Sequence, residues 1–194
     1  MIYKPKNISN NMLNEKYTTD KILIFDIDDT IAITPAKIVV TDTKTGKTFE
    51  LTPEEFNSYE KNRNHLVNFD QFRSLEIMKA GRLIDKYFNV LTKNYKNGVA
   101  IGVITARDNQ SMIYEWFRFH LGFHIDKKLI WAVNDPVHGL SGSIQQRKQD
   151  AMRWFIDQGY TDITFFDDDR NNIKLIKQLE SELGQSIKTH LAKH

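Results

Sequence analysis

The stretch Lys21-Ile22-Leu23-Ile24-Phe25-Asp26-Ile27-Asp28-Asp29-Thr30 decides the fold of this chain. A largely apolar run leads directly into acidic residues, which is typical of a strand that is buried on both faces and ends in a polar loop. Two later stretches, residues 99–107 and 163–172, have the same form. Because ligands of open parallel α/β sheets bind beyond the carboxyl ends of the strands, these three ends predict a single convergent site.

Helical and extended patterns alternate along most of the remaining sequence. From about Arg82 onward, apolar residues at helical spacing predict four helices, followed by Gly98, Gly122, Gly159 and Gly184. Further strands are predicted at residues 129–133 and, at the edge of the sheet, 186–191. Since strands that alternate with helices are joined by right-handed crossovers, we expect an α/β fold with a doubly wound, mostly parallel, Rossmann-like sheet.

An insertion at residues 31–81 interrupts this alternation. Two extended runs on either side of Gly46 predict a hairpin. The sequence Thr52-Pro53-Glu54-Glu55 then predicts the start of a helix, with Thr52 as N-cap and Glu55 closing a capping box. Residues 61–74 are polar, and no regular element is expected there. The insertion should therefore be a small hairpin-and-helix cap that partly covers the site.

Length and composition exclude several classes of protein. The 194 residues suffice for one domain, expected at residues 21–194 after a polar extension at residues 1–20. The formal net charge of +2 gives no overall signal for nucleic acid or an anionic membrane, although a local basic groove remains compatible with it. The absence of cysteine excludes disulfides, thiolate nucleophiles and zinc–sulfur sites. With no apolar stretch near the roughly 20 residues that span a bilayer, we expect a cytoplasmic protein without a membrane partner.

Carboxylates dominate the expected site. Asp26 and Asp28 after the first strand, with Asp167 and Asp168 after a later one, would bring four acidic groups together. Like charges this close repel one another and raise each other's pKa unless a cation compensates. Because the ligands are oxygen atoms with no His or Cys nearby, the expected cation is Mg²⁺.

The ordered set of motifs resembles the haloacid dehalogenase superfamily over roughly residues 21–191. The residues that carry the resemblance are Asp26, Asp28 and Thr30 in a D-x-D-x-T motif, Thr105 at the end of the second strand, Lys148 near the start of a helix, and Asp167, Asp168 and Asn172 in D-D-x-x-x-N. Each motif is weak alone, whereas all four in this order are specific. Two departures are Asp29, which replaces a common glycine, and the third acid Asp169.

The resemblance implies a chemistry for each matching residue. Asp26 would attack phosphorus and form an aspartyl-phosphate, while Asp28 would protonate the leaving oxygen and then deprotonate water. Mg²⁺ would be held by Asp26, the backbone carbonyl of Asp28, and Asp167 or Asp168. Thr105 and Lys148 would bind phosphoryl oxygens, with Arg147 as a competitor for the role of Lys148.

The substrate is indicated only by local similarity. Thr105-Ala106-Arg107 and the Arg147-Lys148 pair are similar to the phosphatase domain of polynucleotide kinase 3′-phosphatases, which implies a phosphate contact for Arg107. Gly46-Lys47-Thr48 lacks the rest of a P-loop, so no kinase module is expected. We therefore expect a Mg²⁺-dependent phosphomonoester hydrolase that acts on a nucleotide or polynucleotide 3′-phosphate.

Three alternatives remain open from the sequence. The same enzyme could act on a sugar phosphate or another small metabolite. A phospho-accepting receiver also combines acids, a hydroxyl and a lysine around Mg²⁺, but there the acidic pair comes first, whereas here Lys148 precedes Asp167. A binding module without catalysis on the same fold is the third alternative.

Overall fold

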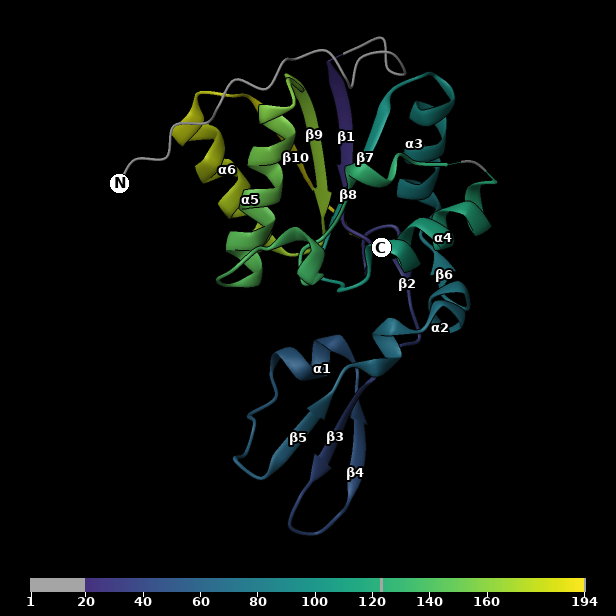
Figure 1. Ribbon diagram of the computed structural model, residues 1–194, viewed down its shortest axis with the longest axis vertical. Coiled ribbons are helices and arrows are strands. Elements are labelled where there is room, and N and C mark those ends of the chain that lie inside the picture. The colour runs from purple at the N-terminus through teal and green to yellow at the C-terminus, as the bar shows by residue number, and fades with distance from the viewer. Residues whose placement is uncertain (1–19, 123, 194) are drawn as a thin grey trace.

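The computed structural model of the protein describes residues 20–122 and 124–193, so the predicted extension lies almost entirely outside the described residues (Figure 1). Its centre is a five-stranded sheet with the order β10-β9-β1-β7-β8, in which every pair of neighbours is parallel. The strands are β1 Lys21–Phe25, β7 Ala100–Thr105, β8 Ile130–Ala132, β9 Asp162–Asp167 and β10 Ile187–Leu191. The parallel sheet and its edge strand β10 agree with the sequence-based expectation.

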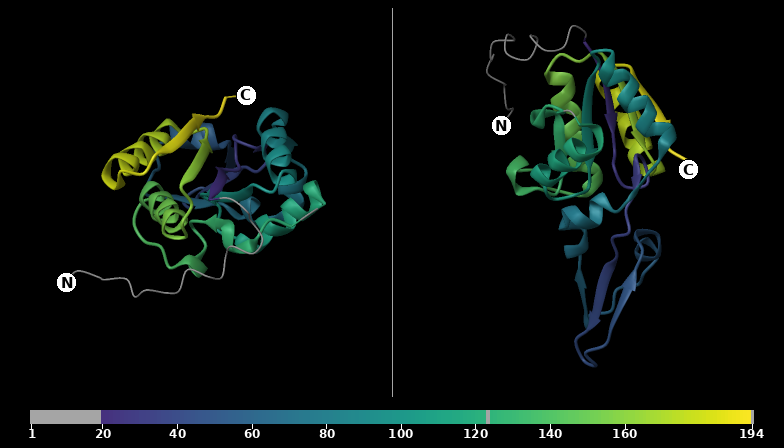
Figure 2. Two further views of the ribbon diagram at one scale, coloured as in Figure 1. Left: turned by 90° about the horizontal axis from the view of Figure 1, so that it is seen from above. Right: turned by 90° about the vertical axis from the view of Figure 1, so that its right-hand side faces the viewer.

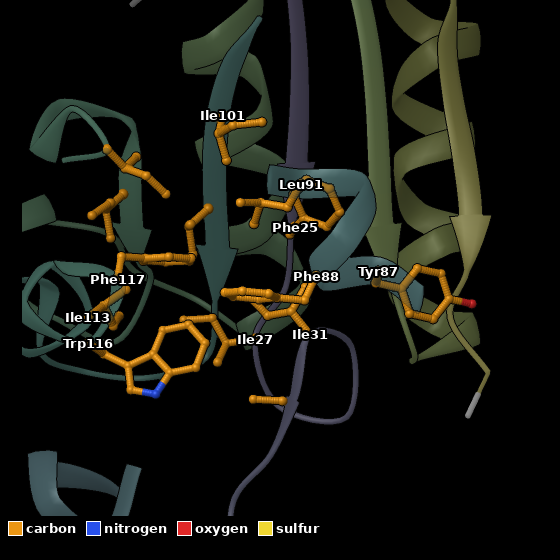
Figure 3. Close-up of a cluster of buried hydrophobic side chains, with 14 of the residues drawn as sticks. Phe25, Ile27, Ile31, Tyr87, Phe88, Leu91, Ile101, Ile113, Trp116 and Phe117 are labelled. Carbon is orange, nitrogen blue, oxygen red and sulfur yellow. The ribbon is translucent and has the colours of Figure 1, made fainter. Parts of the chain in front are cut away.

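Helices cover both faces of this sheet (Figure 2). They are α3 Asp85–Lys96 and α4 Gln110–Leu121 on one face, and α5 Ile144–Asp157 and α6 Arg170–Leu183 on the other. Successive side chains of a strand point to opposite faces. Leu23 and Phe25 of β1 therefore pack with α3 and α4 (Figure 3), whereas Ile22 and Ile24 pack with α5 and α6. This two-sided burial explains why β1 is apolar throughout.

The strand order places a topological switch point between β1 and β9. From β1 the chain proceeds outward through β7 and β8, and it then returns across the sheet to β9 and β10. At such a point the connections from neighbouring strands diverge, which leaves a crevice beyond their carboxyl ends. Asp26 directly follows β1, and Asp167 is the last residue of β9. The backbone N–H of Asp26 donates to the carbonyl of Phe166 at 2.9 Å, so the two ends are directly joined.

The insertion, residues 31–81 and hereafter the cap, lies beyond the carboxyl ends of β1 and β9 (Figure 1). Strands β2 and β6 pair antiparallel as its stem, and β4-β3-β5 form an antiparallel sheet. Its elements are β2 Ala32–Ile33, β3 Ile38–Asp42, β4 Thr48–Leu51, α1 Pro53–Asn57, β5 His65–Asn68, a 3₁₀ turn Asp70–Arg73 and α2 Leu75–Lys79, with β6 Arg82–Leu83 closing the stem.

The cap confirms some local expectations and contradicts others. The hairpin turn has Gly46 at φ +68°, and Thr52 and Glu55 form the capping box of α1. The expectation that residues 61–74 form no regular element was wrong, because β5 pairs with β3, with Val67 opposite Val40. This strand is only four residues long, and its pairing partner, not its own pattern, stabilises it.

The start of α3 also differs from the expectation. Arg82 and Leu83 belong to β6, where they pair with Ile33 and Ala32, and the helix begins only at Asp85. Leu83 therefore fits the helical spacing of the apolar residues of α3 although it belongs to the stem, which is why the helix was predicted to start too early. Among the described residues, no helix has both the length and the apolar character needed to span a membrane.

Candidate active site

Lys148 lies at the centre of the polar groups beyond the sheet. Helix α5 begins with a capping box of Ser143 and Gln146, and Lys148 follows on the face that packs against the sheet. Its side chain is only 5% exposed, and its Nζ lies 3.2 Å from Asp26 Oδ1 and 2.8 Å from Asp167 Oδ2. One ammonium group thus joins the ends of β1 and β9.

Arg147, the competitor for this role, points elsewhere. Its guanidinium donates to the carbonyl of Gly142 at 3.1 Å and to Asn134 Oδ1. It therefore ties the loop before α5 to the loop after β8. Lys148, and not Arg147, reaches the acidic residues.

Asp167 is fully buried and held in a single orientation. Asn172 Nδ2 lies 3.0 and 3.1 Å from its two carboxylate oxygens, and the backbone N–H of Asp169 donates to Oδ1 at 2.9 Å. These donors fix the carboxylate while its second oxygen faces Lys148. Burial of this charge is tolerated because both of its oxygens have donors.

The run of three acids is divided between two roles. Asp168 is partly exposed, and the Thr30 hydroxyl donates to its Oδ1 at 3.4 Å. Asp169 instead caps α6, accepting a hydrogen bond from the backbone N–H of Asn171 at 2.8 Å. Carboxylate oxygens of Asp26, Asp167 and Asp168 all lie within 4.8 Å of one another. Asp169 is not part of this cluster.

The electrostatics of this cluster favour an added cation. Burial raises the pKa of Asp26 well above its usual value, Lys148 opposes this shift, and the charges of Asp167 and Asp168 add to it. Burial and the charge of Asp167 likewise raise the pKa of Asp168 to about 6. For Lys148, burial favours the neutral amine, yet the nearby charges of Asp26 and Asp167 raise its pKa overall, so it stays protonated.

One ammonium group therefore lies among three carboxyl groups, and ionisation of all three would leave an excess of negative charge. A divalent ion would remove this repulsion, and all-oxygen donors suit a hard ion such as Mg²⁺. Asp26, Asp167 and Asp168 are the side chains that fit it. The side chain of Asp28 is outside this cluster, so its only possible share in metal binding is through the backbone carbonyl.

Asp28 is held by Arg107 through a bidentate ion pair. The guanidinium Nε and Nη2 donate to Asp28 Oδ2 and Oδ1 at 2.8 and 2.7 Å. Arg107 Nη2 also reaches Thr34 Oγ1 at 3.3 Å, and this hydroxyl in turn donates to Asp28 Oδ1 at 3.0 Å. The remaining guanidinium nitrogen, Nη1, donates to the carbonyl of Phe72 in the cap at 2.8 Å. In this state Arg107 orients Asp28 and ties the cap to the core.

Thr105 lies at the same edge of the sheet without touching the acidic cluster. It is the last residue of β7 and is 1% exposed. In the register of β1 and β7, Phe25 is opposite Val103, so Thr105 lies two residues beyond the last paired position. Its side chain makes no hydrogen bond to Asp26, Asp167 or Asp168, all of which the structure describes. The turn that follows β1 contains Asp29, which has φ +56°.

The positioning roles of Asn172, Thr34 and Phe72 were not predicted. Asn172 occurs in the D-D-x-x-x-N pattern, but its contact with Asp167 depends on how α6 packs against β9. Thr34 and Phe72 lie in the cap and carry no sequence signal that connects them with Arg107. Only the folded chain brings them within hydrogen-bonding distance.

No protein-family model matches this chain, and no curated protein matches it significantly. The assignment of a function therefore depends on the geometry and chemistry of the site.

Proposed function

We propose that this protein is a Mg²⁺-dependent phosphomonoester hydrolase of the haloacid dehalogenase type, acting through an aspartyl-phosphate. The observation that carries the proposal is the contact of Lys148 with both Asp26 and Asp167, while Asp168 completes a carboxylate cluster. A nucleophile, a fixed cation and a candidate metal site lie together at the switch point of a parallel sheet.

In the first step of this proposal, a carboxylate oxygen of Asp26 forms a bond to phosphorus, and the bond from phosphorus to the ester oxygen breaks. The leaving oxygen takes a proton from Asp28. In the second step water attacks the phosphorus of the aspartyl-phosphate, Asp28 accepts the proton from water, and the Asp26 carboxylate and free phosphate are released. Lys148 neutralises charge that accumulates on the transferring oxygens. When bound, Mg²⁺ would supply further neutralisation of that charge.

The ion pair of Asp28 with Arg107 matters for this cycle. It stabilises the Asp28 carboxylate, which is the form that accepts a proton from water in the second step. For the first step, the contact must open so that Asp28 can carry a proton. A substrate phosphate that draws Arg107 toward itself would open it, which is compatible with the phosphate contact expected for Arg107.

The proposed substrate is a nucleotide or a polynucleotide 3′-phosphate. The resemblance around Thr105, Arg107 and Lys148 supports it, as does a small cap of a two-stranded stem and a three-stranded sheet, which leaves room for a bulky leaving group. A sugar phosphate or another small metabolite is the alternative. The described residues carry no observation that favours a receiver or a silent binding module.

Hydrolysis of p-nitrophenyl phosphate in the presence of Mg²⁺ tests the proposal. We expect turnover by the wild-type protein, none after removal of divalent ions, and none for Asp26→Asn with an unchanged circular dichroism spectrum. Asp169→Asn is the matched control, because asparagine also caps a helix and Asp169 lies outside the carboxylate cluster. Turnover by Asp26→Asn would remove Asp26 from its role. If the wild-type protein were inactive with Mg²⁺, Mn²⁺ and Ca²⁺, the proposal that it is a phosphomonoester hydrolase would be refuted.

A further inference from the structure

Three cations form a stripe along one face of α6. Arg170, Lys174 and Lys177 are spaced by four and three residues, so they lie one above the other on the helix surface. All three are exposed, and none forms an ion pair with any residue that the structure describes. We call these three residues the α6 stripe. In a chain whose net charge is only +2, it is a local concentration of uncompensated positive charge.

The α6 stripe begins at the proposed active site and leads away from it. Arg170 is the first residue of α6 and follows Asp168 by two positions. The three cations line a shallow hollow of about 800 Å³ that continues along the helix past Ile173 and Gln178. Figure 1 shows α6 at the outer side of the molecule, beside α5. A ligand anchored beside Asp168 could therefore extend over this surface.

The arrangement of the cations indicates the shape of the ligand. Seven residues of helix span about 10 Å, so the charges lie in a row and do not converge on a point. A single phosphate needs donors gathered around it, whereas a row of cations matches an anion with regularly repeated charges. Nucleic-acid backbones present such charges, and exposed lysines and arginines bind them without reading sequence.

Two other basic regions of the described residues differ from the α6 stripe. The cap contains seven basic and seven acidic residues and is electrically balanced. Lys93 and Lys96 are also exposed and form no described ion pair, but they lie at the end of α3 that precedes the amino end of β7, opposite the site. At the far end of the α6 stripe, Glu182 is neutralised by Arg153 at 2.8 Å.

We propose that the α6 stripe binds the sugar–phosphate backbone of a single nucleic-acid strand whose terminal phosphate occupies the carboxylate site. This inference rests on the proposed function, and of the substrates proposed there it selects the polynucleotide end and names the surface that binds the strand. Helix α6 would thus bind the part of the substrate that is not hydrolysed.

The experiment compares two matched pairs of substitutions. Lys174→Gln/Lys177→Gln removes two stripe charges, and Lys93→Gln/Lys96→Gln removes two exposed helical lysines with the same spacing far from the site. Each protein is titrated with a single-stranded, 5′-fluorescein-labelled DNA 12-mer that carries a 3′-phosphate. Anisotropy is measured at several salt concentrations with divalent ions removed, so that no hydrolysis is needed. Turnover of p-nitrophenyl phosphate is measured in parallel with Mg²⁺.

We expect the stripe variant to bind the oligonucleotide about tenfold more weakly, and its slope of log affinity against log salt to decrease by about 1.4, as for two lost phosphate contacts. Its turnover of the aryl phosphate should be unchanged, and the Lys93/Lys96 variant should behave as wild type in both assays.

The two assays separate the two proposals. Equal binding by the stripe variant and wild type, or equal weakening by both variants, would overturn the role of the α6 stripe even if aryl phosphate is hydrolysed. Stripe-dependent binding by a wild-type protein that hydrolyses no phosphate ester would instead retain the binding surface and refute the proposed function.

Discussion

At the scale of single residues, the site depends on how many carboxylates each buried cation contacts. Lys148 serves two carboxylates from different strands, and Arg107 serves one carboxylate through two hydrogen bonds. Breaking a buried ion pair by removing one partner is costly, because the other charge stays buried without compensation. Removal of the Lys148 charge would leave two carboxylates without this partner, whereas removal of the Arg107 charge would leave one.

Arg107→Gln should impair the acid–base catalysis by Asp28 in addition to weakening substrate binding. Because glutamine cannot hold both oxygens of Asp28, we expect kcat to fall by about 10²-fold, within the range of lost acid–base catalysis. Asp28→Asn should lose at least as much, and the loss in the double variant should be smaller than the product of the two single losses, since part of the effect of Arg107 acts through Asp28. Fully independent losses in the steady-state kinetics would instead show that Arg107 acts only through the substrate. Arg73→Gln, which breaks the more exposed ion pair with Asp108, is the control.

Asp168→Asn should stabilise the protein in the absence of metal, depending on pH. The pKa of Asp168 is raised from 3.8 to about 6, so the folded state holds the proton more tightly than the unfolded chain. The resulting stability is present at low pH and is lost as the pH rises through 6. At pH 7.5 the variant should be more stable by about 1 kcal/mol after allowance for solvent screening, or about 2–4 °C in Tm.

Thermal unfolding with a chelator measures this effect. At pH 5 the wild type is largely protonated at Asp168, so the difference should shrink. Addition of Mg²⁺ at pH 7.5 should raise the Tm of the wild type more than that of Asp168→Asn. A variant less stable than wild type at pH 7.5 without metal would contradict the charge excess.

At the scale of elements, the first turn of α6 organises the site. Asp169 caps the helix, and Asn172 in its first turn orients Asp167. The start of α6 is thus linked to the Asp167 carboxylate by the backbone N–H of the cap residue Asp169 and by the side-chain amide of Asn172. This coupling gives Asp169 a structural role beside two acids that are proposed to bind the metal.

Asp169→Ala should lower stability without abolishing chemistry. Loss of an N-cap costs about 1 kcal/mol, which corresponds to about 2–4 °C in Tm for a chain of this size. We expect kcat for p-nitrophenyl phosphate to fall less than tenfold, whereas Asp167→Asn should abolish turnover. Loss of activity in Asp169→Ala comparable to that of Asp167→Asn, at a temperature where both are folded, would place Asp169 in the metal site.

At the scale of the whole molecule, the cap sheet and the core sheet are separate layers. No residue between 38 and 70 belongs to either of the two core clusters, although Ile38 and Val40 are buried within the cap. The two layers meet through the stem, and polar contacts such as Arg107 with Phe72 add to this link. The core should therefore fold without the cap sheet.

Replacing residues 38–70 by a short Gly-Ser linker tests this independence. Lys37 and Gln71 are joined by a hydrogen bond of 2.8 Å, so a short linker can close the gap. We expect cooperative thermal unfolding and retained hydrolysis of p-nitrophenyl phosphate, because Asp26, Lys148 and Asp167 are all outside the excised part. Non-cooperative unfolding would show that the cap sheet is part of the folding unit.

The positions of the main strands could be predicted because their signals are local. A strand such as Ile22-Leu23-Ile24-Phe25 is apolar because both of its faces are covered, and the acids that follow must lie at its carboxyl end. The sequence was misleading where pairing dominates over pattern. Val67 is in a strand because it pairs with Val40, and Arg82 is in a strand because it pairs with Ile33.

The sequence alone determined the parallel α/β architecture and the edge of the sheet at which the acids lie, since periodicity and strand ends are properties of neighbouring residues. Only the tertiary structure decided that Lys148 reaches the carboxylates while Arg147 does not, that Asp169 caps a helix, and that Arg107 holds Asp28. The physical reason is that each of these outcomes depends on distances of a few ångströms between residues far apart in the chain. Such distances are set by the packing of helices on the sheet and not by local pattern.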